Sequence, residues 1–222
     1  MKKEKKRRRL KVGRLFMVLI ILALISFLIT KLLDVRIMRI DIRGNNILTD
    51  DEVIRYAKLE DYPSFLKTLT FNVKNDIKKG KYVKDVKVYK GIFSIKIRIT
   101  EEKVLYIDKN TMEKVTLEER IKDDKSICAP YLINEVPSDK KAEFNKTMSK
   151  INSNIICLMS EIKYDPNEID KDRYYVNMND GNGVYLTVNK FNKLNNYNKI
   201  LENIGRQNGI LYLDYGDYFK AY

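Results

Sequence analysis

The sequence contains no histidine and no tryptophan, and it has only two cysteines among its 222 residues. Without histidine there is no Ser-His-Asp or Cys-His catalytic arrangement and no His-ligated metal site. Two cysteines are too few for a disulfide scaffold. No Gly-rich phosphate loop and no Cys-rich metal spacing is present either. The composition therefore argues against most hydrolases and metalloenzymes.

The net charge of +13 is concentrated at the N-terminus. Residues 1–14 contain nine Lys or Arg and one acid, a net of +8, which leaves +5 for the rest of the chain. A body with so little excess charge is not typical of a nucleic-acid-binding domain. The length suggests one to two domains.

A long apolar run begins at Leu15 and continues to Leu33, with Lys31 near its end. As a helix, residues 15–33 span about 28 Å, close to the thickness of the hydrocarbon layer. A buried core helix is rarely apolar on every face, and a cleaved signal peptide usually has a shorter run followed by a small-x-small site. We therefore expect an uncleaved transmembrane helix at 15–33.

The distribution of cations around this helix predicts its direction. Nine Lys or Arg precede it, whereas residues 34–48 contain three. The more basic side normally stays in the cytoplasm. We expect a cytoplasmic tail at 1–14 and extracytoplasmic residues 34–222. A nucleic-acid arm is a weaker interpretation of the tail, because its position before the helix already explains its charge.

The two cysteines, Cys128 and Cys157, both fall in the extracytoplasmic part. An oxidising compartment permits a disulfide between them. Cys157 lies in an apolar helical pattern, where a buried free thiol is the more common state. Both states are open from the sequence.

Residues 35–103 form a first module outside the membrane. Alternating apolar residues predict strands at 38–43, around Val86 and Val88, and at 93–100. Between the first two strands, Thr49 to Glu52 form a capping box that opens a short helix. Asn72 is placed to cap a second short helix. The predicted order is β-α-α-β-β.

Two polar segments of this module could suggest a site. Gly44-Asn45-Asn46 is typical of a turn that needs a positive φ, rather than of a ligand site. Glu101 and Glu102 are adjacent in a strand, so they point to opposite faces and cannot flank one substrate as an acid/base pair. We interpret them as solvated charges at the strand end.

Residues 104–222 form a second module. The pattern predicts a helix at 139–159, a hairpin that turns at Asp180-Gly181, a second helix at 191–204 and a final strand at 210–215, besides short strands near 104–106, 115–117 and 129–133. Helices laid on one face of a mainly antiparallel sheet give an α+β domain. The fold class is therefore α+β throughout.

The first module resembles a polypeptide-transport-associated (POTRA) module of the FtsQ/DivIB type, a family of single-pass bacterial cell-division proteins. The segments that carry the resemblance are Met38-Arg-Ile-Asp-Ile-Arg-Gly-Asn-Asn46, Thr49 to Glu52, 83–89 and 95–102. The second module is similar to the family's β-domain in segments 151–162, 176–188, 193–201 and 212–214. The family commonly has Arg where this chain has Gly216.

The resemblance implies a non-enzymatic, membrane-anchored scaffold at the division septum, without a cofactor, metal or catalytic residue. Its partners would be bitopic division proteins of the FtsL and FtsB/DivIC type and, through them, the septal peptidoglycan synthase. One alternative is a membrane-tethered POTRA scaffold for protein secretion or assembly. A cell-wall hydrolase is a second alternative.

We place the partner site at the final strand, Ile210 to Tyr215, and expect binding by strand addition at its edge. The candidate residues are Tyr212, Asp214, Tyr215 and Tyr218, because this terminus is unusually aromatic and aromatic residues are enriched at binding hot spots. The alternative is that these rings complete the core.

Overall fold

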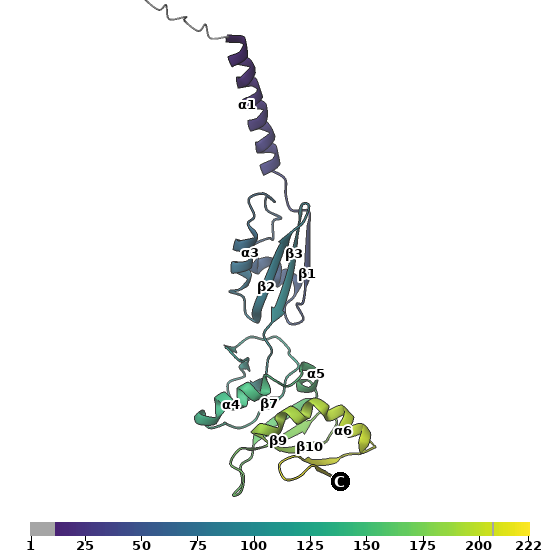
Figure 1. The fold of residues 1–222 in the computed structure, drawn as a ribbon. Helices are drawn as coiled ribbons and strands as arrows, with labels where there is room; N and C mark the ends of the chain where they lie inside the picture. Colours follow the sequence, from purple (N-terminus) through teal and green to yellow (C-terminus); the bar gives the residue numbers. More distant parts are fainter. Residues whose placement is uncertain (1–11, 206) are drawn as a thin grey trace, which may run out of the picture. The chain divides into compact units, whose positions relative to one another are not determined.

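The computed structural model describes residues 12–205 and 207–222. The chain divides into two compact units, one up to Glu101 and one from Glu102 (Figure 1). The basic residues of segment 1–11 lie outside the described residues. The predicted α+β class, with an N-terminal apolar helix ahead of two mixed units, is confirmed.

Helix α1 runs from Val12 to Leu33. Within the described part of the chain, its segment Gly13–Leu33 is the one helix long and apolar enough to cross a membrane, and none of it is buried against the protein. Apolar side chains on all sides of an unpacked helix suit a lipid environment rather than water.

The first unit has the predicted β-α-α-β-β order. Its elements are β1 (Arg39–Arg43), α2 (Asp50–Tyr56), α3 (Thr70–Ile77), β2 (Val83–Lys90) and β3 (Ser94–Glu101). β3 is central, parallel to β1 and antiparallel to β2. Its inward residues Ile95, Ile97 and Ile99 are buried, as are Val73 and Ile77 of α3. The alternation seen in the sequence therefore marks the core face of the sheet.

Of the two N-caps predicted for the helices of this unit, one is confirmed and one is wrong. The capping box is confirmed: the Thr49 hydroxyl accepts from the Glu52 backbone N–H, and the Glu52 carboxylate accepts from the Thr49 N–H. The predicted cap at Asn72 is wrong, because α3 begins at Thr70 with Leu69 at its N-cap position. The apolar stripe located this helix without defining its first residue.

The turn after β1 is held by Glu101. Gly44 has a φ of 89°, and a Cβ there would lie 2.1 Å from the Ile99 carbonyl oxygen, so glycine is required. The Glu101 carboxylate accepts three backbone N–H groups, from Asn46, Ile47 and Leu48, each at 2.8 Å. Our interpretation of Glu101 as a solvated charge is wrong, because its carboxylate ties this loop to the end of β3.

The second unit contains one large mixed sheet with helices on one face (Figure 1). The strand order is β12-β11-β10-β9-β8-β7-β4-β5-β6. The strands are β4 (Tyr106–Asp108), β5 (Lys114–Val115), β6 (Arg120–Ile121), β7 (Tyr131–Leu132), β8 (Met159–Tyr164), β9 (Arg173–Met178), β10 (Gly183–Thr187), β11 (Gly209–Tyr212) and β12 (Tyr218–Ala221). The helices are α4 (Ser138–Met148), α5 (Ser153–Ile156), the 3₁₀ helix η1 (Val188–Asn196) and α6 (Tyr197–Asn203).

The predicted single helix at 139–159 is wrong. The helix ends at Met148, a separate turn forms at 153–156, and the chain then enters β8. The break falls in a run of serine and asparagine residues, whose side chains compete with helical hydrogen bonds. Ile151 and Ile155 are buried as predicted, but Ile151 lies in the connection after α4 and Ile155 in the short helix α5.

The second predicted helix, at 191–204, divides into η1 and α6. η1 is rich in asparagine, which has low helix propensity and favours turns. Asn195 uses its side chain to accept from the Asn152 N–H (2.7 Å) and to donate to the Lys150 carbonyl (3.2 Å). This asparagine therefore joins η1 to the connection that follows α4.

The core of the second unit lies between the sheet and its helices. Phe144 of α4 stacks on Tyr174 of β9, with ring centroids 4.9 Å apart, and meets Phe191 of η1 edge-on at 5.7 Å. These three rings are fully buried. The structure also joins Cys128 and Cys157 as a disulfide, with Cα atoms 5.1 Å apart.

Candidate interaction surface

Four tyrosines form a continuous row across the sheet face that the helices leave open. Tyr175, Tyr185, Tyr212 and Tyr218 occupy paired positions on β9, β10, β11 and β12. The centroid distances between successive rings are 4.6, 5.4 and 4.6 Å. We call these residues the tyrosine row. The Tyr185–Tyr212 and Tyr212–Tyr218 pairs are stacked, and the Tyr175–Tyr185 pair is tilted. Rings in contact along such a row form a semi-rigid surface, since each neighbour limits the rotation of the next.

The alternation of each strand decides which face carries the row. Val176, Leu186 and Leu211 point to the opposite side and are buried under the helices. At Gly183 a Cβ would lie 2.3 Å from the Tyr175 hydroxyl oxygen, so the absence of a side chain there gives the Tyr175 ring its place. Burial, and then the neighbouring tyrosines, raise the pKa of Tyr175. Tyr175 is therefore protonated and uncharged at neutral pH.

Arg173 supports the row from within the sheet. Its guanidinium carbon lies 3.7 Å from the ring centroid of Tyr185. Its Nε donates to Asp214 at 2.8 Å and its Nη1 to Asp165 at 2.9 Å. Burial opposes the charged form of this guanidinium, but the hydrogen bond to Asp214 and the nearby charges of Asp214 and Asp165 together outweigh burial and raise the pKa of Arg173. The arginine thus fixes the turn after β11 and the ring of Tyr185 together.

The final strand differs from our expectation. β11 is not a free edge, because it pairs with β10 on one side and with β12 on the other. The chain turns back after Asp214 through Gly216, which has a φ of 70°, and residues Tyr218–Ala221 cover β11. In the part of the chain that the structure describes, no strand lies beyond β12, so β12 is the open edge at this end of the sheet.

The outward backbone groups of β12 follow from its register. The Tyr222 N–H donates to the Asn208 carbonyl at 3.1 Å. In an antiparallel ladder such hydrogen-bonded positions alternate with positions whose N–H and C=O point away. Phe219 and Ala221 therefore direct their backbone groups outward, and Tyr218 and Lys220 face β11.

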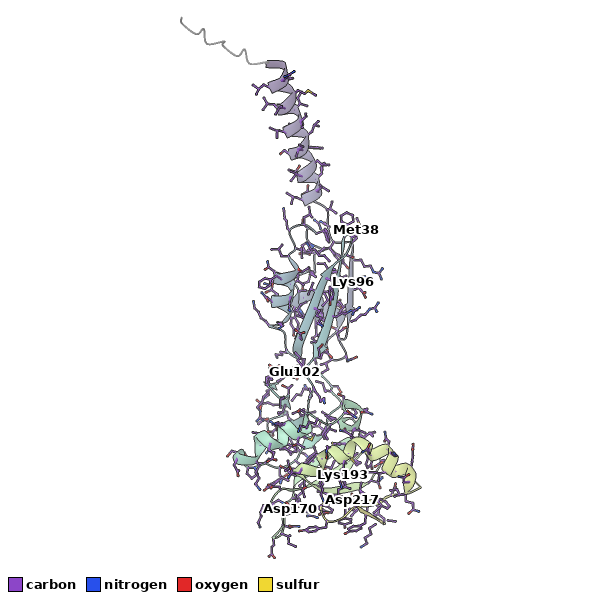
Figure 2. The ribbon with its side chains drawn as sticks, in the orientation of Figure 1. Met38, Lys96, Glu102, Asp170, Lys193 and Asp217 are labelled. Atoms are coloured by element: carbon purple, nitrogen blue, oxygen red, sulfur yellow. A yellow bond between two sulfur atoms is a disulfide. The ribbon has the colours of Figure 1, made fainter. Side chains whose placement is uncertain are left out.

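An apolar hollow borders β12 on the helix side of the sheet. It is lined by apolar side chains in or next to α6, β11 and β12, namely Ile200, Ile204, Leu211, Leu213 and Phe219. Lys193 and Asp217 form an ion pair at its rim with an N–O distance of 2.6 Å, and Figure 2 shows these two residues side by side. A strand added to β12 would meet this hollow on one face and the end of the tyrosine row on the other.

The sequence-predicted site residues occupy different environments. Tyr215 and Tyr218 are about half exposed, and Tyr212 is half-buried within the row. Asp214 is nearly inaccessible, with 3% of its side chain exposed, and its carboxylate is used by Arg173. Tyr175, Tyr185 and Arg173 were not predicted from the sequence. Their positions on the polar side of the predicted hairpin were the available signal.

Proteins of the FtsQ/DivIB type, which the sequence resembles, commonly have an arginine two positions after the Asp of the final strand. Gly216 occupies that position and serves the turn instead. Asp214 receives its guanidinium from Arg173 of β9, a residue distant in the sequence. Among residues 12–205 and 207–222, no group of three or more Cys, Asp or Glu is placed to hold a metal ion.

Residues 35–102 match the FtsQ-type POTRA domain family. The chain is 28% identical to the cell division protein DivIB of Geobacillus kaustophilus, over 82% of this chain and 74% of that protein. It is 26% identical to DivIB of Bacillus subtilis, over 99% of this chain and 88% of that protein.

A solved structure is also similar, that of the major extracytoplasmic domain of the trans isomer of DivIB from Geobacillus stearothermophilus. It is 27% identical with a TM-score of 0.38, and the match covers 48% of this chain and 97% of that chain. The POTRA match and the curated relatives agree with the resemblance found in the sequence. The chain is similar to DivIB cell division proteins, and its first unit contains an FtsQ-type POTRA domain.

Proposed function

We propose that this chain is a non-enzymatic scaffold of the division machinery that binds a partner by strand addition at β12. The observation that carries the proposal is an open strand edge with a ready surface on each side, the tyrosine row on one and the apolar hollow on the other. Strand addition takes its affinity from backbone hydrogen bonds and its specificity from pockets for alternate side chains. Tyr215 and Tyr218 contact the partner directly, and Asp214 acts through Arg173 by fixing the turn.

The partners follow from the family resemblance. They are the bitopic FtsL and FtsB/DivIC-type proteins, which connect the scaffold to the septal peptidoglycan synthase. Residues 1–14 form the cytoplasmic tail, 15–33 the membrane span, 35–103 the POTRA domain and 104–222 the β-domain. The protein accumulates at the division septum with residues 34–222 outside the membrane. Absence of a midcell band from a fluorescent fusion in dividing cells would favour the secretion scaffold instead.

A proline in β12 tests the mode of binding. Ala221→Pro removes one outward N–H, whereas Ala221→Val keeps it and retains strand propensity. Ala221 is exposed and its N–H is not needed by β11, so both variants are expected to fold. Each variant is co-expressed with FtsL- and DivIC-type partners and purified from detergent-solubilised membranes. We expect Ala221→Pro to lose the partner and Ala221→Val to retain it.

The near-ultraviolet circular dichroism of the stacked tyrosines provides the folding control. A folded Ala221→Pro variant that retains its partner would refute strand addition at β12. Release of muropeptides from purified peptidoglycan by the full chain would refute the non-enzymatic assignment.

A further inference from the structure

One end of the POTRA unit exposes large apolar side chains. Ile92, in the turn between β2 and β3, is 89% exposed, Met38 is 72% exposed and Leu66 is 47% exposed. We call these three residues the apolar tip. Figure 2 shows Met38 at one end of the three-stranded sheet, with Lys96 farther along β3. Apolar side chains left this exposed commonly mark a contact with another protein or with a membrane.

Backbone hydrogen bonds hold the segments of the tip together. The Met38 N–H donates to the Phe93 carbonyl at 2.8 Å, and the Phe65 N–H donates to the Val35 carbonyl at 2.8 Å. The rings of Phe65 and Phe93 meet edge-on with centroids 5.6 Å apart. The three apolar side chains thus project from one joined structure rather than from three independent loops.

The tip is tied to the end of the apolar helix. The Ser64 hydroxyl donates to the carbonyl of Leu33, the last residue of α1, at 2.5 Å. Arg36 and Ser64 form a further bridge between the two segments. Met38 follows Leu33 by five residues, which reach at most ~18 Å even when fully extended. If α1 spans the membrane, Met38 is held within that distance of the end of the span.

The charges around the tip suit an anionic surface. The three segments that build it, 34–39, 61–67 and 89–94, contain four cations and two acids, a net of +2. Arg36, Arg39 and Lys67 are exposed. Lys90 donates to the Phe65 carbonyl at 2.6 Å and lies 4.6 Å from the centroid of its ring. An apolar centre with a cationic rim is the pattern of proteins that sit at the membrane interface.

The turn that presents Ile92 is itself conformationally costly. Phe93 has a φ of 48°, a value that bulky residues rarely adopt. In this conformation the Phe93 ring contacts the ring of Phe65, while the side chain of the preceding Ile92 remains exposed. The fold therefore maintains an exposed isoleucine at some cost in backbone strain.

We propose that the POTRA domain docks on the outer leaflet of the membrane, with Met38, Leu66 and Ile92 inserted between headgroups and the surrounding cations on lipid phosphates. The proposal rests on the membrane anchoring in the proposed function. The occupant is an anionic phospholipid surface, because Met38 follows the last residue of α1 by five residues and exposed cations surround the tip. Docking would fix the height and orientation of the domain relative to the membrane.

The absence of tryptophan from the chain allows a direct test. Ile92→Trp places a single tryptophan at the tip of the full-length protein. Ile169→Trp is the matched control, because Ile169 is also a highly exposed isoleucine, at 78%, but lies in the second unit. Phe27→Trp in α1 reports on the membrane span. Each variant is reconstituted in phosphatidylglycerol vesicles with and without brominated acyl chains, which quench tryptophan on contact.

We expect Ile92→Trp to show blue-shifted emission and a loss of intensity in brominated lipid, and Ile169→Trp to show neither. Strong quenching of Phe27→Trp together with identical behaviour of the other two variants would overturn docking while leaving the anchor intact. Emission of Ile92→Trp that shifts only when a partner protein is added would also overturn it, in favour of a protein contact. Equal quenching in phosphatidylcholine would overturn the role assigned to the cations.

Discussion

Replacing Asp214 by asparagine should destabilise the second unit strongly, because it removes the charge that Arg173 requires. The two side chains are 3% and 15% exposed, and their nitrogen–oxygen distance is 2.8 Å. Breaking a buried ion pair from one side costs about 3–5 kcal/mol. Arg173 keeps Asp165 at 2.9 Å, so we expect a loss at the lower end, about 3 kcal/mol. For a unit of this size that corresponds to a fall in Tm of roughly 12 °C.

Asp217→Asn is the matched control, three residues further along the same turn. Asp217 also pairs with a cation, Lys193, but 58% of its side chain is exposed. Exposed pairs contribute about 0–1 kcal/mol, so this variant should unfold almost as the parent does. The two substitutions are chemically identical and differ in burial.

The assay is urea unfolding of the full chain in detergent, followed by near-ultraviolet circular dichroism of the tyrosines. A double-mutant cycle with Arg173→Met separates the pair from other effects, since the double variant should cost less than the sum of the two single changes. If Asp214→Asn and Asp217→Asn lose the same stability, the reasoning about Arg173 and Asp214 is refuted.

Three further predictions concern other parts of the chain. Glu101→Ala leaves three backbone N–H groups without their carboxylate and should cost the first unit about 1–3 kcal/mol in the same assay; no loss would contradict the loop-anchoring role. Burial raises the pKa of Tyr106 to about 12, so between pH 10 and 12 the unfolded state binds fewer protons than the folded state, and the free energy of unfolding should fall as the pH rises. Urea unfolding followed by tyrosinate absorbance at 295 nm measures this dependence, and a free energy of unfolding that does not change over this range would contradict the prediction. In intact cells of a background without the native cysteines, an impermeant thiol reagent should label Asn110→Cys but not Lys3→Cys. Labelling of Lys3→Cys would contradict the expected topology.

The element order and the core face of the first unit could be predicted from the sequence, because buried and polar residues alternate along its strands. Ile95, Ile97 and Ile99 alternate with polar residues on a strand that turns out to be central, so the pattern and the structure agree. The capping box likewise involves residues only three positions apart. Local rules of this kind need no knowledge of the remainder of the fold.

Strand β8 shows where those rules failed. Met159 and Ile162 continue the helical spacing of the preceding apolar residues, and this continuation hid a change of structure after Cys157. Long-range pairing with β7 and β9 stabilises this segment as a strand. Periodicity in one sequence contains no information about such partners.

The candidate site was also predicted only in part from the sequence. Tyr212 and Tyr218 were selected for their aromatic surroundings, but their neighbours Tyr175 and Tyr185 come from a hairpin some 30 residues earlier. The edge was assigned to the wrong strand, because β12 is short and follows a turn at Gly216. Only the register of the sheet brings these residues into one row.

The parallel pairing of β1 and β3 also determines how the POTRA domain responds to mechanical load. The chain enters β1 at Arg39 after the apolar helix and leaves β3 at Glu101 toward the second unit. Tension between these two points pulls the two strands along their length in opposite directions. The ladder is paired at five successive positions, from Arg39 with Ser94 to Arg43 with Arg98. Its hydrogen bonds are therefore loaded together in shear, so the domain can transmit force without peeling apart one bond at a time.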